Sequence, residues 1–256
     1  MAFSQDLLKD KTILVTGAGK GIGKACALLA DACGANVIAV ARTESDLVAL
    51  KNESSERLSF WVGDVQDKAL YEKIQALPLL HGLINNAGTT TYVNHMELEK
   101  LTPEVWERTF SVNVFGTFQM VRAAEKPLRA SGNGSIVNVG SIAGVAGIGS
   151  SIAYAASKGA VNTMTLSLAR VLAPEVRINT ICPGFVGTKW QRDGQGDGYE
   201  EYVKGVEAGT PQQHACTAED IADSVVQMAL GHRYMTGETI LVDAGSHLGF
   251  SPLVAR

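Results

Sequence analysis

A set of glycines at the end of the first apolar run constrains the fold of this chain more than any other feature. The glycines occupy alternate positions, Gly17, Gly19, Gly21 and Gly23. The apolar run Thr12–Thr16 predicts a short buried strand, and Gly23–Cys33 has helical spacing that stops at Gly34. Glycine allows a sharp turn and close backbone approach, and a helix N-terminus attracts negative charge. The segment therefore predicts a strand, a tight turn and a helix, with an anion such as a pyrophosphate at the turn.

The spacing of these glycines is G-x-x-x-G-x-G. It departs from the strict dinucleotide pattern G-x-G-x-x-G, because Ile22 and Lys24 stand where the last glycine of that pattern would fall. A P-loop is excluded, because no Gly-Lys-Ser or Gly-Lys-Thr triplet follows. The alternative is a tight turn that binds nothing. We disfavour it, because extra glycines weaken the start of a helix.

Apolar, β-rich runs alternate with helical patterns along the 256 residues. Such alternation predicts βαβ units, a doubly wound parallel sheet and helices on both faces. We find no repeat and no linker, so we expect one α/β domain over residues 1–256. The expected strands are Thr12–Thr16, Asn36–Val40, Leu58–Val62, Gly82–Asn85, Ser135–Val139, Val176–Ile181 and Glu238–Val242, and the expected long helices are Pro103–Leu128 and Ala153–Leu172.

Composition excludes several function classes. Hydrophobic residues make up 46% and charged residues 19% of the chain, which is typical of a globular protein. The net charge is -4 and no basic stripe is visible, so we expect no nucleic-acid partner. The four cysteines form no C-x-x-C pair, so we expect no metal site and a reducing compartment.

The chain carries no pattern of a membrane protein. Its first ten residues contain acids and lack an apolar core, unlike a signal peptide. The longest uncharged run, Ser135–Ser157, contains many Gly and Ser residues rather than a continuous apolar stretch. We therefore expect a cytoplasmic protein without a membrane partner.

A tyrosine and a lysine stand four residues apart in the second long helix. Tyr154 and Lys158 should therefore lie on one face, one turn from each other. A free tyrosine has a pKa near ~10, and a nearby ammonium favours the phenolate and lowers that pKa. We expect Lys158 to tune Tyr154 as a general acid/base.

Two further polar residues accompany this pair. Ser141 follows the strand Ser135–Val139, at the sheet edge where open α/β folds bind ligands. Its hydroxyl could donate to a substrate oxygen. Asn113 lies inside the first long helix, where asparagine is unfavourable unless its side chain has a role. The expected catalytic set is Asn113, Ser141, Tyr154 and Lys158.

The order of these motifs resembles that of the short-chain dehydrogenases/reductases, over about Lys11 to Gly245. The matching motifs are T-G-x-x-x-G-I-G from Thr16, N-N-A-G from Asn85, Asn113, Ser141 thirteen residues before Tyr154, Y-x-x-x-K over Tyr154–Lys158, and Pro183-Gly184. Each motif alone is weak, and the ordered set is specific. The resemblance implies a seven-stranded Rossmann-like sheet, and an oxidoreductase that moves a hydride between a nicotinamide and a ketone or secondary alcohol.

The resemblance also implies roles for single residues. It implies that Asn113 holds a water that passes protons to Lys158, that Asp64 and Val65 clamp the adenine, and that the segment from Pro183 to Thr188 crosses the nicotinamide. It further implies a homotetramer or homodimer formed through the two long helices. The expected cofactor-binding residues are Gly17, Gly19, Lys20, Gly21, Ile22, Gly23, Arg42, Asp64, Val65, Asn86, Ala87, Gly88, Tyr154, Lys158, Pro183, Gly184, Val186 and Thr188.

The residues after the second strand indicate which coenzyme is bound. Enzymes that prefer NAD place an acid about twenty residues past the glycine turn, where it binds the ribose 2′-hydroxyl. Here Arg42 follows the strand, and Glu44 comes later, where the next helix should start. A guanidinium suits a 2′-phosphate, and Lys20 could approach the same phosphate. We therefore expect NADP(H), the alternative being that both cations are solvated surface charges.

Residues Gly187–Gly209 form a polar, glycine-rich insertion that carries Trp190, Tyr199 and Tyr202. A long polar insertion with exposed aromatic residues is typical of a lid, so we expect a substrate lid here.

Two questions stay open at this point. Within the enzyme class, the second half of the chain resembles 3-oxoacyl-carrier-protein reductases, and the first half also resembles carbonyl, diacetyl and xylulose reductases. The other class is a non-catalytic NADP-binding sensor or regulator, which the retention of Asn113, Ser141, Tyr154 and Lys158 disfavours. The substrate and the favoured direction do not follow from the sequence.

Overall fold

The structure, a computed structural model, describes residues 7–249, and within them the strands form one parallel sheet. The sheet has seven strands in the order β3-β2-β1-β4-β5-β6-β7. The strands are β1 (Thr12–Thr16), β2 (Asn36–Ala41), β3 (Leu58–Val62), β4 (Gly82–Asn85), β5 (Gly134–Val139), β6 (Val176–Pro183) and β7 (Thr239–Val242). The predicted Rossmann-like α/β fold is confirmed. The interpretation of residues 1–256 as one domain stays a prediction, because residues 1–6 and 250–256 lie outside the described part.

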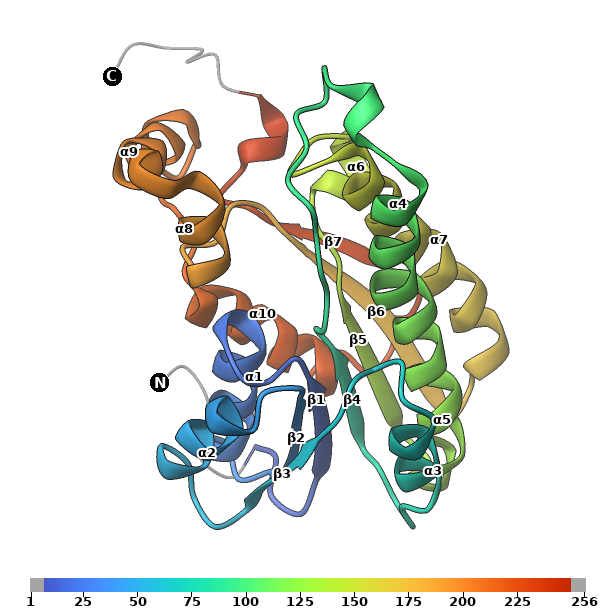
Figure 1. The fold of residues 1–256 in the computed structure, drawn as a ribbon. Coiled ribbons are helices and arrows are strands. Elements are labelled where there is room, and N and C mark those ends of the chain that lie inside the picture. Colours follow the sequence, from blue (N-terminus) through green and yellow to red (C-terminus); the bar gives the residue numbers. More distant parts are fainter. Residues whose placement is uncertain (1–6, 250–256) are drawn as a thin grey trace.

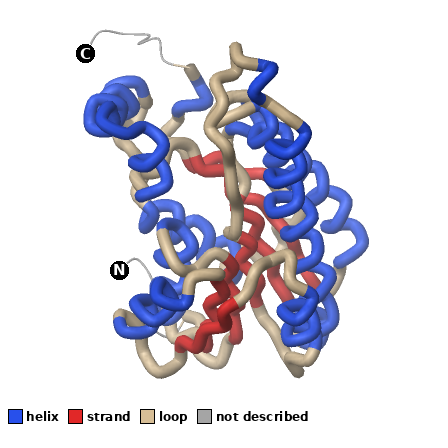
Figure 2. The backbone as a smooth tube through the Cα atoms, in the orientation of Figure 1, coloured by secondary structure: helices blue, strands red, loops and turns tan. Residues whose placement is uncertain are grey.

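Helices cover both faces of the sheet, as Figures 1 and 2 show. One layer contains α1 (Gly21–Ala32), α2 (Glu44–Asn52) and α10 (Ala218–Leu230), and the other contains α3 (Lys68–Gln75), α4 (Pro103–Phe110), α5 (Thr117–Ala130) and α7 (Ile152–Leu172). The remaining helices are α6 (Ala143–Ala146), α8 (Lys189–Gln195) and α9 (Tyr199–Gly209), with 3-10 turns at Leu98–Lys100, Gly196–Gly198 and Ser246–Leu248.

The strands are apolar on both faces because each face has its own core. In β1, Ile13 and Val15 point into the cluster shared with α1, α2 and α10, while Leu14 points into the cluster shared with α3, α5 and α7. All three side chains are fully buried. This explains why the strands were recognisable as continuous apolar runs rather than as alternating patterns.

The expected long helix Pro103–Leu128 is helical throughout but is not a regular α-helix over its whole length. It consists of α4, a π-helical turn at Ser111–Gly116, and α5, which extends to Ala130 and contains Pro127. Single π turns inside α-helices frequently lie at functional sites. The helices α3 and α10 were not predicted.

The sheet reverses its strand order between β1 and β4. Successive connections leave these two neighbouring strands toward opposite faces, so a crevice opens beyond their carboxyl ends. A cavity of about 1060 Å³ lies here. The glycine turn borders one end of it and Tyr154 the other. Within residues 7–249, every helix is too short or too polar to cross a membrane.

Candidate active site

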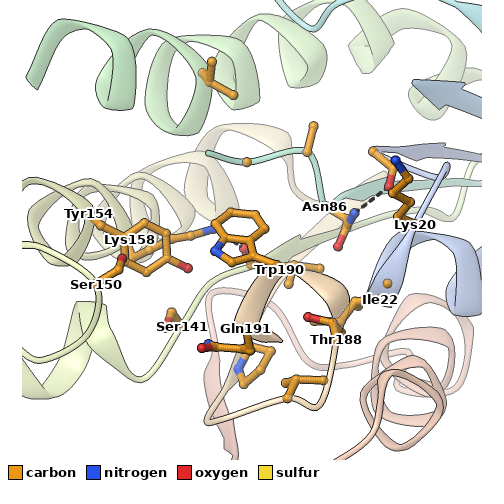
Figure 3. Close-up of a pocket in the computed structure, with 18 of the residues that line it drawn as sticks. Lys20, Ile22, Asn86, Ser141, Ser150, Tyr154, Lys158, Thr188, Trp190 and Gln191 are labelled. Carbon is orange, nitrogen blue, oxygen red and sulfur yellow. Dashed lines mark hydrogen bonds between the residues drawn. The ribbon is translucent and has the colours of Figure 1, made fainter. Parts of the chain in front are cut away.

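The glycine turn is held open by a neighbouring asparagine. The Asn86 side chain donates to the carbonyl oxygens of Thr16 and Gly17, at 3.1 Å each, and Figure 3 marks a hydrogen bond of Asn86 beside Lys20. Gly17 has a φ of +63°, and a Cβ on it would lie 2.8 Å from the Asn86 amide nitrogen. Only glycine fits at position 17. The two hydrogen bonds from Asn86 hold the backbone of the turn in this conformation.

Gly23 was predicted to bind the cofactor, but it lies outside the cavity lining. A Cβ on it would overlap the Gly17 carbonyl and the Asn86 amide. Gly23 therefore lets α1 pack closely against the turn, rather than facing a ligand.

Two ion pairs occupy the corner of the cavity beyond the end of β2. The Lys20 ammonium lies 2.9 Å from a carboxylate oxygen of Asp46, and Arg42 lies 3.5 Å from Asp64. All four residues line the cavity. Asp46 comes from the first turn of α2, which packs against Gly19. The two predicted phosphate-binding cations thus face the cavity, each beside an acid that sequence reasoning did not assign to it.

Tyr154 lies in the first turn of α7, at the opposite end of the cavity. Its backbone N–H donates to the Ser151 hydroxyl, the N-cap of this helix, at 3.2 Å. Ser141 follows β5 and is held in place by the Ala143 N–H, which donates to its hydroxyl at 3.1 Å. Lys158 is buried one turn after Tyr154, and its ammonium lies 5.7 Å from the centre of the Tyr154 ring. The structure therefore brings Ser141, Tyr154 and Lys158 together, as Figure 3 shows.

Burial controls the acidity of this pair. Burial raises the pKa of the Tyr154 hydroxyl to about 12, and a hydrogen bond with Ser141 opposes that rise. Burial also lowers the pKa of the Lys158 ammonium to about 8. We expected Lys158 to lower the pKa of Tyr154. In this geometry the Tyr154 pKa moves the other way, because the loss of water around the hydroxyl outweighs the hydrogen bond with Ser141.

Asn113 lies behind the cavity wall, in the π turn. Its side-chain oxygen accepts a hydrogen bond from the Thr89 N–H at 2.8 Å, and its amide donates to the Thr89 carbonyl at 3.0 Å and to the Ser157 hydroxyl at 2.9 Å. Ser157 in turn donates to the Tyr154 carbonyl at 2.7 Å. The Asn113 side chain therefore links the loop after β4 to α7, and it does not line the cavity.

Residues after β6 close the cavity on a third side. The predicted segment from Pro183 to Thr188 lines it, and so do Trp190 and Tyr202 from α8 and α9. Tyr199 differs from the expectation of an exposed aromatic residue. It is only 7% exposed, because it packs against Phe185 and under the Arg192 guanidinium.

Most of the predicted site residues line this single cavity. They are Gly17, Gly19, Lys20, Gly21, Ile22, Arg42, Asp64, Val65, Asn86, Ala87, Gly88, Ser141, Tyr154, Lys158, Pro183, Gly184, Val186 and Thr188.

Sequence reasoning missed residues 92–95 in the loop after β4. All four line the cavity, and the buried Nε2 atom of His95 makes no hydrogen bond with the described residues. Lone residues in an irregular loop have no periodicity, so the sequence carried no signal for them. Within residues 7–249, no group of three or more His, Cys, Asp or Glu side chains is arranged to hold a metal ion.

Comparison with known proteins agrees with this arrangement. The family model described as short chain dehydrogenase matches residues 11–197. The protein assigned as ketoacyl reductase 2 of the granaticin polyketide synthase of Streptomyces violaceoruber is 36% identical, over 92% of this chain and 95% of its own length. L-xylulose reductase of Caenorhabditis elegans is 35% identical, over 92% and 95%.

A solved structure of a reductase has a similar fold. The 3-oxoacyl-(acyl-carrier-protein) reductase of Agrobacterium tumefaciens C58, solved with NADP bound, has a TM-score of 0.84 and 28% identity, over 93% of this chain and 95% of that chain. The family model covers more than half of the chain, and the two relatives match nearly all of it. The chain therefore belongs to the short-chain dehydrogenase/reductase family, oxidoreductases that use nicotinamide cofactors.

Proposed function

We propose that this protein is an NADPH-dependent oxidoreductase that interconverts a ketone and a secondary alcohol, with Tyr154 as the general acid/base. The observation that carries the proposal is a single cavity with the glycine turn at one end and the Ser141, Tyr154 and Lys158 side chains at the other. Such a cavity can hold an extended dinucleotide and a small substrate together. The names of the ketoacyl and xylulose reductase relatives support a carbonyl substrate.

The residues at the turn fit a dinucleotide. Lys20 is the N-cap of α1 but supplies no side-chain acceptor for the first N–H groups of the helix. Those N–H groups can therefore bind a pyrophosphate. Gly17 and Gly21, with φ of +63° and +53°, shape the turn that leads to them. An anion bound at this turn would satisfy these N–H groups.

A bound nicotinamide supplies or accepts the hydride at the substrate carbon. In the reduction, Ser141 and Tyr154 bind the carbonyl oxygen, and Tyr154 transfers its phenolic proton to that oxygen as the alcohol forms. The raised pKa of Tyr154 keeps this proton on the hydroxyl at neutral pH. Lys158, which is largely protonated below its pKa of about 8, stabilises the phenolate that is left.

Asn113 and Ser157 position this machinery. Their hydrogen bonds fix α7 against the loop after β4, so that the Tyr154 hydroxyl keeps its place. We propose that Asn113 acts through this contact, and we retain the water-holding role that the family resemblance implies as a prediction.

The preference for NADPH rests on the corner beyond β2. Arg42 and Lys20 face the cavity where the ribose of the adenine half would lie, and the acid typical of NAD binding is replaced by Arg42. Asp46 and Asp64 balance their charges, so a 2′-phosphate would compete with these carboxylates for the two cations. The relative from Agrobacterium tumefaciens, solved with NADP, supports the same choice.

The test is turnover with a generic diketone such as diacetyl, measured as the loss of NADPH absorbance. The proposal predicts steady consumption of NADPH and formation of the hydroxyketone. A protein that binds NADPH but reduces no ketone, and oxidises no alcohol with NADP, would be a sensor or regulator instead.

A further inference from the structure

Four aromatic side chains gather at the Tyr154 end of the cavity. They come from separate segments: Tyr92 from the loop after β4, Phe185 from the segment after β6, Trp190 from α8 and Tyr202 from α9. Tyr92, Trp190 and Tyr202 keep 42%, 41% and 45% of their surfaces exposed, although all three line the cavity. Aromatic surface left open inside a cavity favours an apolar ligand.

Trp190 lies next to the reacting group. Its ring centre is 6.4 Å from that of Tyr154, with the two planes at 63°. Figure 3 shows the indole between the Tyr154 side of the cavity and the Asn86 and Lys20 side. Phe185 and Tyr202 form a second pair, with ring centres 5.4 Å apart. A ketone whose oxygen reaches Tyr154 must therefore extend along aromatic walls.

Tyr92 fixes the position of α8, and therefore of Trp190. Its hydroxyl donates to the Trp190 carbonyl oxygen at 3.5 Å. Its ring lies so close to Gly194 that a Cβ on that residue would overlap the ring. Glycine at this point of α8 permits the contact. The aromatic walls are thus built into the fold, from two segments nearly one hundred residues apart in the sequence.

The charged groups at this end of the cavity are already paired, and the polar side chains of Asn94, His95 and Gln191 line the cavity beside the aromatic ones. Lys189 and Asp193 neutralise each other at 2.7 Å. Among the cavity-lining residues that the structure describes, the other charged group at this end is Lys158, which is buried and bonded to the Val139 carbonyl. The Ser150 hydroxyl is bonded to that of Thr90 at 2.6 Å.

We propose that the substrate is an uncharged ketone whose carbonyl is attached to a planar apolar ring, or lies in a ring fused to one. This inference rests on the proposed function and narrows it, since the open aromatic surface disfavours an open-chain ketose and the paired charges disfavour an acyl thioester of an anionic coenzyme. The ring stacks against Trp190 and Tyr92, and the carbonyl oxygen reaches Tyr154 and Ser141. Stacking of this kind is specific in geometry and adds to burial of the ring.

The first test compares 2-tetralone, L-xylulose, acetoacetyl-coenzyme A and diacetyl as substrates, with whichever of NADPH and NADH the protein uses better. The expected kcat/KM for 2-tetralone is about tenfold or more above those of the ketose and the thioester. A higher kcat/KM for the ketose or the thioester contradicts the substrate class and leaves the proposed function standing. Failure to reduce any of the four ketones contradicts both.

The second test uses two glycines in consecutive helices, Gly194 in α8 and Gly205 in α9. Gly194→Ala forces the Tyr92 ring away from α8, and Gly205→Ala adds a methyl group to open space in α9, where nothing lies within 4 Å. Gly194→Ala should raise the KM for 2-tetralone about tenfold and leave the Kd for the coenzyme unchanged. Gly205→Ala should match the wild type in both.

A third variant keeps the test decisive if Gly194→Ala proves unstable. Trp190→Ala removes one aromatic wall from the surface of α8, so it should raise the KM for 2-tetralone more than the KM for diacetyl, which is too small to lie along that wall. Equal changes for the two ketones, or no change for 2-tetralone, would overturn the proposal.

Discussion

The Lys158 ammonium donates a 2.7 Å hydrogen bond to the carbonyl oxygen of Val139. Val139 ends β5, and Ser141 follows two residues later. The bond therefore ties α7, which carries Tyr154, to the loop that carries Ser141. Burying the charged ammonium of Lys158 costs free energy of folding. The stability of the protein should therefore depend on whether Lys158 is protonated, and so on pH.

The first prediction concerns the stability of the protein without ligands. Between about pH 8 and 10.5 the unfolded chain holds the Lys158 proton more tightly than the folded chain. Raising the pH through this window therefore stabilises the folded state. From about pH 10 upward the raised pKa of Tyr154 acts in the opposite direction, because the folded chain then keeps a proton that the unfolded chain loses. The usable window is thus about pH 8 to 10.

Lys158→Met removes this dependence. Between pH 7 and 10, the Tm of the wild type should rise relative to that of Lys158→Met by roughly 5 °C, from about 2–3 kcal/mol of relieved burial. Thermal unfolding followed by circular dichroism measures it. Lys68→Met, at an exposed lysine of α3, is the control and should follow the wild type. A constant difference between wild type and Lys158→Met would contradict the lowered pKa.

The second prediction concerns coenzyme choice. Arg42→Asp replaces a guanidinium with the acid that binds a ribose hydroxyl, so it should erase or reverse the preference for NADPH. One charge-assisted contact is worth about 1.5–3 kcal/mol, so the ratio of kcat/KM values should change about tenfold to a hundredfold. Asp46→Asn frees Lys20 from its ion pair and should raise the preference.

Arg233→Asp, at an exposed arginine outside the cavity, is the matched control and should leave the ratio unchanged. A wild-type protein with a higher kcat/KM for NADH than for NADPH would contradict the role assigned to Arg42, without affecting the role of Tyr154.

The third prediction is a homodimer or homotetramer formed through α5 and α7. Phe115 is 61% exposed beside α5, and Leu166 is largely exposed on α7, whereas Met120 and Val161 are buried in the core. Surplus apolar surface on such helices usually marks an interface. Light scattering at micromolar concentration should show an oligomer, and Phe115→Lys should weaken its association about thirtyfold. Val48→Lys, at an exposed residue of α2, is the control and should leave the association unchanged. A monomeric wild type refutes the prediction.

The fourth prediction is that the predicted lid, Gly187–Gly209, closes over the substrate. Its two helices, α8 and α9, carry Trp190 and Tyr202 into the cavity. Hydrogen exchange of their backbone amides should slow about tenfold when coenzyme and a substrate analogue are both bound. Exchange in α3, on the other side of the sheet, provides the reference. Equal lid exchange with and without ligands would count against closure.

The sequence predicted the sheet well because the central strands are buried on both faces and the edge strands keep apolar runs. Thr12–Thr16, Leu58–Val62 and Gly82–Asn85 have the same bounds in the structure as in the prediction. Continuous apolar runs that end at glycine or asparagine leave little freedom for these boundaries. The helix α10 was missed although Thr217 and Asp220 form a capping box at its start.

Other features had no signature in the sequence. The glycine content of 187–209 favoured a loop, yet packing of Tyr199 against Phe185 stabilises helices there. Asn113, in the π turn, bonds to Thr89 and Ser157, which are distant in the chain. Motif spacing identified the residues of the site, but their partners depend on tertiary contacts, several of them with backbone atoms.

The most direct test of the account is the turnover of Tyr154→Phe, which keeps the ring and removes the hydroxyl. Proton transfer by a positioned acid contributes about 10²–10⁴ in rate, so kcat for a reduced ketone should fall by about a hundredfold or more. The Kd for NADPH, measured by fluorescence titration, should stay near that of the wild type, because the phosphate-binding end of the cavity is unchanged. A Phe variant that keeps most of the wild-type kcat would contradict the assignment of Tyr154 as the proton donor.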